Sequence, residues 1–218
     1  MSLNSSKFCT QTFGTCTKVD DDYMEITVET IQTQIPYYLT QDSKENLAKA
    51  LQDFPEINYY TSLYPTDILQ GDGWNKFEII KFEDCVRKEI KGIVLSNTCD
   101  ISPDNSRQIP PKITFAPIIK LNSYSELLKS KGIDQQRIDS RLQTIREQKV
   151  TTMFFLPRGE ILDDDYVALL DDLHTIPFNV FETKKERVKQ FTLSQVGFYL
   201  FLLKLSVNFC RFHENIER

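Results

Sequence analysis

GIVLSNTCDI, residues 92–101, begins as an apolar run and ends in four polar or reactive side chains. The nearly continuous apolar residues predict a strand that is buried in the centre of a sheet. Side chains leave the core where strands end, and there they are free to do chemistry. The stretch therefore predicts a core strand and, just after it, a first place to look for function.

Two more strand candidates lie on either side of this run along the chain, at residues 76–82 and 112–119. With residues 91–96 they are predicted to form the centre of one sheet. Strands are also expected at 151–156 and 165–173, with an acidic turn between them. Near the N-terminus, alternation of apolar and polar residues predicts a half-buried strand at 23–31.

Helices are predicted in three places. The first, at 43–54, carries an apolar stripe and ends at Pro55. A helical pair at about 123–147 has the capping-box spacing SYSE at its start, and its second helix is capped by Asp134. The third helix, at about 192–212, is expected to begin at the capping-box sequence TLSQ. It is apolar on most of its circumference, so we expect neighbours on several sides.

Composition places the chain among ordinary globular proteins. The 218 residues carry a net charge of -5, which argues against a surface built for nonspecific nucleic-acid binding. Five cysteines form no CxxC pair, and an odd, scattered set fits a reducing, cytoplasmic setting. No membrane span is expected, because the apolar segment Val196–Phe209 falls short of the roughly 20 residues that a bilayer requires.

Four short sequences carry a family resemblance when they are taken in order. They are GD at 71–72, GIVLSN at 92–97, ITFAPII at 113–119 and YVALLDDLHTI at 166–176. In this order they resemble the PemK/MazF family of small SH3-like barrels, which includes many messenger-RNA-cleaving toxins. The chain is also similar to uncharacterised bacterial proteins with a Val-Leu-Ser-x-x-Cys-Asp-Ile sequence.

The resemblance implies a fold class and a division of the chain. The expected fold is α+β, an SH3-like β-barrel with an inserted helical pair and a long C-terminal helix. Residues 71–218 would form the barrel, with the insertion at about 123–147 and the helix at about 192–212. Residues 1–70 would be an N-terminal strand and helix elaboration packed on it, and the whole is expected to be one folded unit.

Departures from the family pattern bear on activity. Ribonuclease members have an Arg before the second strand, where this chain has Ile90, and a Thr or Ser before the third, where it has Lys112. Arg and Lys are not interchangeable at a phosphate. The sequence therefore favours a diverged interaction or regulatory module, in a toxin-antitoxin or phage-defence setting. The alternatives are an endoribonuclease with a rebuilt active site and a thiol-dependent enzyme.

Cys99 and Asp100 form the sharpest local feature. An exposed thiol at a strand end acts as a nucleophile if a neighbour lowers its pKa, but an adjacent carboxylate works in the opposite direction. The interpretation that the sequence favours is a small, buried Cys99 with Asp100 capping the following turn. Whether the protein is an enzyme stays open at this point.

The other candidate residues are spread along the chain. Lys91, Lys112 and His174 are candidates for catalysis with Cys99 and Asp100, while Thr98, Asp72 and Arg158 are candidates for binding. No spacing resembles a zinc or calcium motif, and neither a metal nor another cofactor is expected.

The two functional classes differ in what the fold must bring together. An enzyme needs a concave site where these candidates converge. A module needs a buried Cys99 and an exposed apolar or aromatic patch, for which tyrosines at 37, 38, 59, 60 and 64 are candidates. A protein partner or a homodimer is expected, and RNA is possible, although the net charge does not indicate it.

Overall fold

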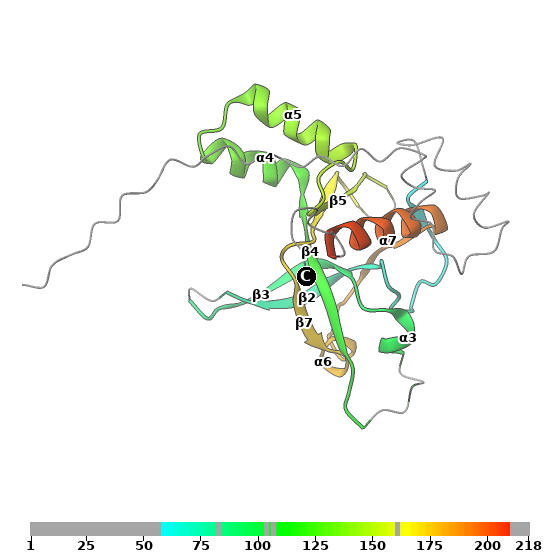
Figure 1. Ribbon diagram of the computed structural model, residues 1–218. Helices are drawn as coiled ribbons and strands as arrows, with labels where there is room; N and C mark the ends of the chain where they lie inside the picture. Colours follow the sequence, from blue (N-terminus) through cyan, green and yellow to red (C-terminus); the bar gives the residue numbers. More distant parts are fainter. Residues whose placement is uncertain (1–57, 82–83, 103–104, 106–107, 160–161, 210–218) are drawn as a thin grey trace, which may run out of the picture.

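The computed structural model describes residues 58–81, 84–102, 105, 108–159 and 162–209. Strands and helices alternate irregularly, and the fold is α+β (Figure 1). The strands are β1 (Tyr60–Thr61), β2 (Gly73–Ile80), β3 (Arg87–Val94), β4 (Lys112–Lys120), β5 (Met153–Leu156), β6 (Tyr166–Leu169), β7 (His174–Pro177) and β8 (Lys189–Leu193). The helices are α3 (Thr98–Ile101), α4 (Leu121–Ser130), α5 (Gln135–Arg146), α6 (Phe178–Glu182) and α7 (Gln195–Phe209).

The strands form one antiparallel sheet that curls into a half-barrel. Its order is β1-β8-β2-β3-β4-β6-β5, with β7 also paired to β4. The two end strands approach each other, since the Tyr60 hydroxyl donates a 2.6 Å hydrogen bond to the carbonyl of Pro157, just after β5. The predicted central strands β2, β3 and β4 are indeed neighbours in the middle of the order.

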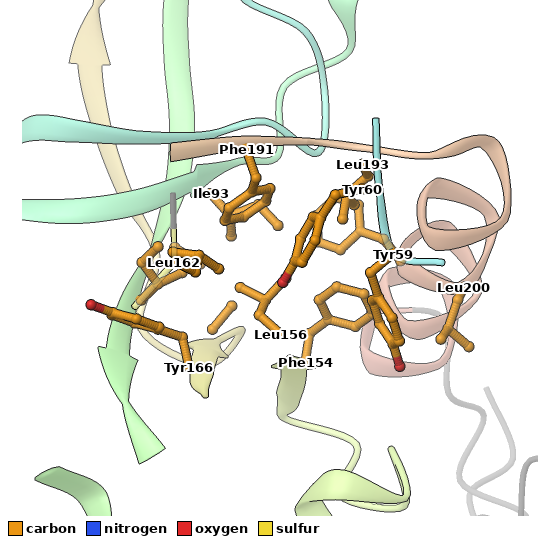
Figure 2. Close-up of a cluster of buried hydrophobic side chains, with 14 of the residues drawn as sticks. Tyr59, Tyr60, Ile93, Phe154, Leu156, Leu162, Tyr166, Phe191, Leu193 and Leu200 are labelled. Atoms are coloured by element: carbon orange, nitrogen blue, oxygen red, sulfur yellow. The ribbon is translucent and has the colours of Figure 1, made fainter. Parts of the chain in front are cut away.

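Three hydrophobic clusters explain why the central strands are so apolar. One fills the curl of the sheet beneath α7, and Figure 2 shows its tyrosines, phenylalanines and leucines pointing toward one another. A second lies around Phe77, whose ring stacks between those of Phe115 and Phe181 at centroid distances of 4.1 and 4.3 Å. The third lies under the helical pair. Neighbouring residues of β3, such as Ile93 and Val94, enter different clusters, so both faces are buried at the end of this strand, while its first three residues are exposed.

The helical pair is confirmed, with one correction at its start. Asp134 caps α5 by accepting a 3.0 Å hydrogen bond from the amide of Arg137. The predicted SYSE capping box is wrong, because α4 begins earlier, after Lys120, with no side-chain cap. The chain enters α4 directly from the buried strand β4, so no separate capping turn is needed.

The C-terminal helix is confirmed within the described residues, again with a shifted start. The cap is Ser194, whose hydroxyl accepts a 3.1 Å hydrogen bond from the amide of Gly197, while Thr192 is a buried residue of β8. Gly197 lets α7 touch β1, since a Cβ there would lie 2.6 Å from the carbonyl oxygen of Tyr59. The predicted end at 212 lies outside the described residues, as do the predicted strand at 23–31 and helix at 43–54.

Only residues 166–169 of the predicted strand at 165–173 form a strand, β6, and a separate strand, β7, begins at His174. β6 pairs with the end of β4 and β7 with its beginning, and a turn separates them. His174 therefore opens β7 and does not end a longer strand. Among the described residues, no helix is long and apolar enough to cross a membrane, and no three His, Cys, Asp or Glu side chains are grouped to hold a metal ion.

Candidate functional site

A hollow on the described surface lies beside Trp74, the only tryptophan of the chain. Its volume is about 570 Å³, and we call it the Trp74 pocket. It is lined by residues 61–63, 65–66 and 187–192 together with Trp74. The pocket therefore lies between β8 and the segment that follows β1.

The pocket forms because β1 pairs with β8 over only two residues. The ladder between them consists of the pairs Tyr60–Leu193 and Thr61–Thr192, and no further pair follows along the described chain. Beyond Thr61 the chain turns outward, and Leu63 and Tyr64 are 62% and 56% exposed. The edge of β8 next to the pocket is thus left without a strand partner, and this edge position is where an added strand could pair.

Two cations lie against the aromatic ring in the pocket. The guanidinium carbon of Arg187 is 5.4 Å from the centroid of Trp74 and 5.6 Å from that of Phe181. The Nζ atom of Lys189 lies 5.5 Å from the Trp74 centroid. Contacts of this length are cation–π interactions, which hold the charged groups in place while leaving donors for a ligand.

Lys189 is anchored by a buried carboxylate. Its Nζ lies 2.7 Å from Oδ2 of Asp72 and donates a 2.6 Å hydrogen bond to the carbonyl of Tyr64. Asp72 is fully buried and also accepts a 2.8 Å hydrogen bond from the amide of Leu69. Burial raises the pKa of Asp72 to about 6, and the pairing with Lys189 opposes that rise. The binding candidate Asp72 does not line the pocket itself, and it acts by holding Lys189 in the pocket wall.

Two donors at the pocket are buried and without a hydrogen-bond partner. They are Nε1 of Trp74 and Nη1 of Arg187. A buried donor without a partner costs free energy, roughly 1–3 kcal/mol for a typical group. Both residues line the pocket, so a ligand that supplies acceptor atoms there would relieve that cost.

Lys91 belongs to a separate cluster around Tyr166. Its Nζ lies 3.2 Å from the Tyr166 hydroxyl, which donates a 2.8 Å hydrogen bond to Asp163. Lys120 completes the cluster with a 2.6 Å ion pair to Asp163. Lys120 holds the pKa of Asp163 down at about 2, whereas burial and Asp163 raise the pKa of Tyr166. The charges of Asp163 and Lys120 are matched within the cluster, which therefore fits a structural role.

Cys99 is exposed, so the interpretation of a buried cysteine is wrong, and the burial of Cys99 that was expected of an interaction module is not found. The strand ends two residues earlier than that interpretation required, and Asn97 caps the short helix α3 by accepting a 2.9 Å hydrogen bond from the Cys99 amide. Only Ile101 of this helix is buried. Thr98 accepts a 2.9 Å hydrogen bond from the amide of Gln70, so it ties α3 to the turn before β2.

The exposure of Cys99 allows a direct test of thiol chemistry. Cys85 is also exposed and serves as an internal reference. We expect both thiols to be alkylated in the native protein at rates within about threefold of each other, because both are exposed to the reagent. Peptide mass spectrometry would measure this, and a far faster reaction of Cys99 below neutral pH would favour the thiol-dependent enzyme.

Two of the remaining candidates, His174 and Lys112, lie at opposite ends of the ladder between β7 and β4. His174 stacks on Phe115, with its Nε2 2.9 Å from Asp172, a distance that fits an ion pair although the geometry is not that of a hydrogen bond. Lys112 is exposed on the same ladder. Since side chains alternate along β4, it points to the face opposite His174.

Arg158 lies near the other end of the sheet. It is exposed, and its amide donates a 3.1 Å hydrogen bond to Asp165, after β5. Figure 1 shows β5 and α3 well separated. Cys99 and Arg158 therefore come from separate parts of the fold, and the lining of the Trp74 pocket includes neither of them, nor Lys91.

Sequence reasoning missed the three residues that matter most in the pocket. Trp74, Arg187 and Lys189 come from distant parts of the chain, and their meeting depends on the pairing of β2 with β8. One local feature was available. Arg187 and Lys189 are two residues apart, and this spacing places two cations on the same face of a strand.

Comparison with known proteins does not place the chain in a family. No model of a known protein family matches it, and no curated protein is significantly similar to it. The resemblance to PemK/MazF proteins thus stays a prediction.

Proposed function

We propose that this protein is a diverged PemK/MazF-like barrel that acts as an interaction or regulatory module and binds an acidic, extended segment of a protein partner in the Trp74 pocket. The curled antiparallel sheet and the helix after its last strand support the barrel type. The elements that carry the resemblance also occur in the expected order. A toxin-antitoxin or phage-defence setting follows from the resemblance alone.

One observation carries this proposal. Arg187 and Lys189 face a pocket whose lining, in the described part of the chain, contains no Asp, Glu or His side chain. The pocket also runs along the edge of β8 where its ladder with β1 has ended. Extended peptides bind by adding a strand to such an edge, with side-chain pockets giving specificity. Cations beside the edge select an acidic strand.

An endoribonuclease with a rebuilt site is the second candidate. It is favoured by the same two cations, which could bind a phosphate and stabilise charge on it. Cleavage through the ribose hydroxyl also needs a group that takes a proton. Because the described lining provides neither an imidazole nor a carboxylate, the geometry supports binding better than cleavage.

Trp74 makes the binding proposal directly testable. As the only tryptophan, it is the sole source of tryptophan fluorescence, and it lines the pocket. Titration with short poly-L-glutamate is expected to change its emission in a saturable way. We expect Arg187→Gln to weaken that binding about tenfold, since a charge-assisted contact is worth roughly 1.5–3 kcal/mol.

The matched control is Lys112→Gln, which removes an exposed cation outside the pocket. It should leave the affinity for poly-L-glutamate unchanged. Equal losses in both variants would mean that binding is nonspecific and would contradict the proposal. Cleavage of single-stranded RNA by the wild-type protein, abolished by Arg187→Gln, would instead support the ribonuclease.

A further inference from the structure

The Trp74 pocket lies beside the point where the first 57 residues join the described fold. Asn58 accepts a hydrogen bond from the hydroxyl of Ser194, next to the end of β8. The chain then forms β1, and Thr61 is the first residue that lines the pocket. Residues 1–57 are therefore joined to the fold at a point only a few residues from the pocket.

That N-terminal part contains a strongly acidic stretch, VDDDYMEITVET at 19–30. It carries three aspartates and two glutamates and no lysine or arginine. The pocket has the opposite charge pattern, with Arg187 and Lys189 in its wall. Complementary potentials of this kind steer and orient an association.

The periodicity of the stretch fits the open edge as well. Met24, Ile26 and Val28 alternate with polar or acidic residues, the pattern of a strand with one apolar and one charged side. The pocket wall has both an apolar and a cationic part that such a strand could contact. Leu63 and Val188 are 62% and 46% exposed, and the two cations lie next to them. A strand added at β8 would have apolar side chains to rest on and cations to pair with.

We infer that residues 20–30 of this same chain occupy the Trp74 pocket in cis and compete with the acidic partner. This inference rests on the proposed function, because residues 20–30 would occupy the same pocket as the acidic partner and would be displaced by it. The segment between residue 30 and Asn58 spans up to roughly 90 Å when extended, so it reaches the pocket without strain. Tethering gives such a segment an effective concentration in the millimolar range, so that even a weak contact is populated.

The test uses the full chain with three neutralising changes, Asp20→Asn, Asp21→Asn and Asp22→Asn. Poly-L-glutamate affinity, measured through Trp74 emission, should rise about tenfold once the internal competitor is weakened. The matched control is Glu126→Gln, Asp139→Asn and Asp171→Asn, which removes three exposed negative charges outside the pocket. It should leave the affinity within about twofold of wild type, because screening weakens distant charges.

Carbodiimide cross-linking gives an independent readout of the same contact. In the wild-type chain, Lys189 should become joined to the peptide that contains residues 20–22. A Lys189 joined only to Asp72, together with unchanged affinity in the Asn variant, would overturn the inference. If poly-L-glutamate binds neither protein, the proposed function fails, and the cross-link alone then decides whether the acidic segment occupies the pocket.

Discussion

Replacing Lys204 by methionine is expected to stabilise the protein at pH 6 and to lose that advantage in alkaline solution. Lys204 lies on the inner face of α7 with 2% of its surface exposed, and its ammonium group donates a hydrogen bond to the carbonyl of Gln148. Burial lowers the pKa of Lys204 to about 7. At pH 6 the folded protein must carry a buried charge, which methionine removes, for a gain of about 2 kcal/mol.

The pH dependence follows from proton binding in the two states. Below pH 7, Lys204 is protonated in both the folded and the unfolded chain. Between pH 7 and the ordinary lysine pKa, only the unfolded chain binds the proton, so the stability of the wild type rises with pH. The whole shift corresponds to about 3–5 kcal/mol, so the wild type should become the more stable protein above about pH 9.

Urea unfolding of both proteins at about pH 6, 8 and 10 would measure this difference. Tyrosines and other lysines titrate in both chains, so their effects cancel in the comparison. Lys131→Met, at an exposed position, is the control and should show no dependence on pH relative to wild type. A constant difference between wild type and Lys204→Met would show that the buried charge carries no cost.

The second large effect is expected from Gly73→Ala in β2. A Cβ at this position would lie 2.2 Å from Cε1 of Phe191, its partner on β8. Phe191 is 3% exposed and packs against Tyr60 at a centroid distance of 5.3 Å, so its ring has no room to move aside. We expect the added methyl group to lower the free energy of unfolding by about 3 kcal/mol.

A second substitution identifies the cause. Phe191→Leu shortens the side chain above Gly73, and the double variant should lose less stability than the sum of the two single variants. Gly132→Ala is the comparison, because a Cβ there meets nothing within 4 Å and only its positive φ of 78° is unfavourable. A loss from Gly73→Ala no larger than that from Gly132→Ala would contradict the packing argument.

Gly73 also shows where sequence reasoning stops. The sequence Gly71-Asp72-Gly73 is typical of a turn, and Gly71 has a positive φ of 86°. Gly73, however, is needed for a contact with a residue more than a hundred positions away. Periodicity and local capping identify elements because they depend on near neighbours. The order of strands, which decides this contact, leaves no such local pattern.

In the candidate site, too, features that depend on near neighbours could be predicted, whereas contacts that depend on strand order could not. Residues at strand ends could be found in the sequence, and Cys99 is exposed as its strand-end position allowed. Tyr59 and Tyr60 are buried, whereas Tyr64 is exposed. The sequence could not predict this difference, because all three tyrosines lie in one short aromatic stretch and differ only in which strand they meet. The tyrosines at 37 and 38 lie outside the described residues. The Trp74 pocket forms only when β8 pairs with β2. The spacing of residues along the sequence does not predict that pairing.

The neighbouring positions of β1, β8 and β2 also bear on how the chain folds during synthesis. Of the strands in the described residues, β8 is the last to be made, yet it lies between the first two, β1 and β2. Until Leu193 has left the ribosome, β2 has no partner on that edge and the pocket has no second wall. Contacts so distant in sequence form slowly. A nascent chain therefore exposes an unpaired strand edge for most of its translation, and this is the stage at which it is most prone to aggregate.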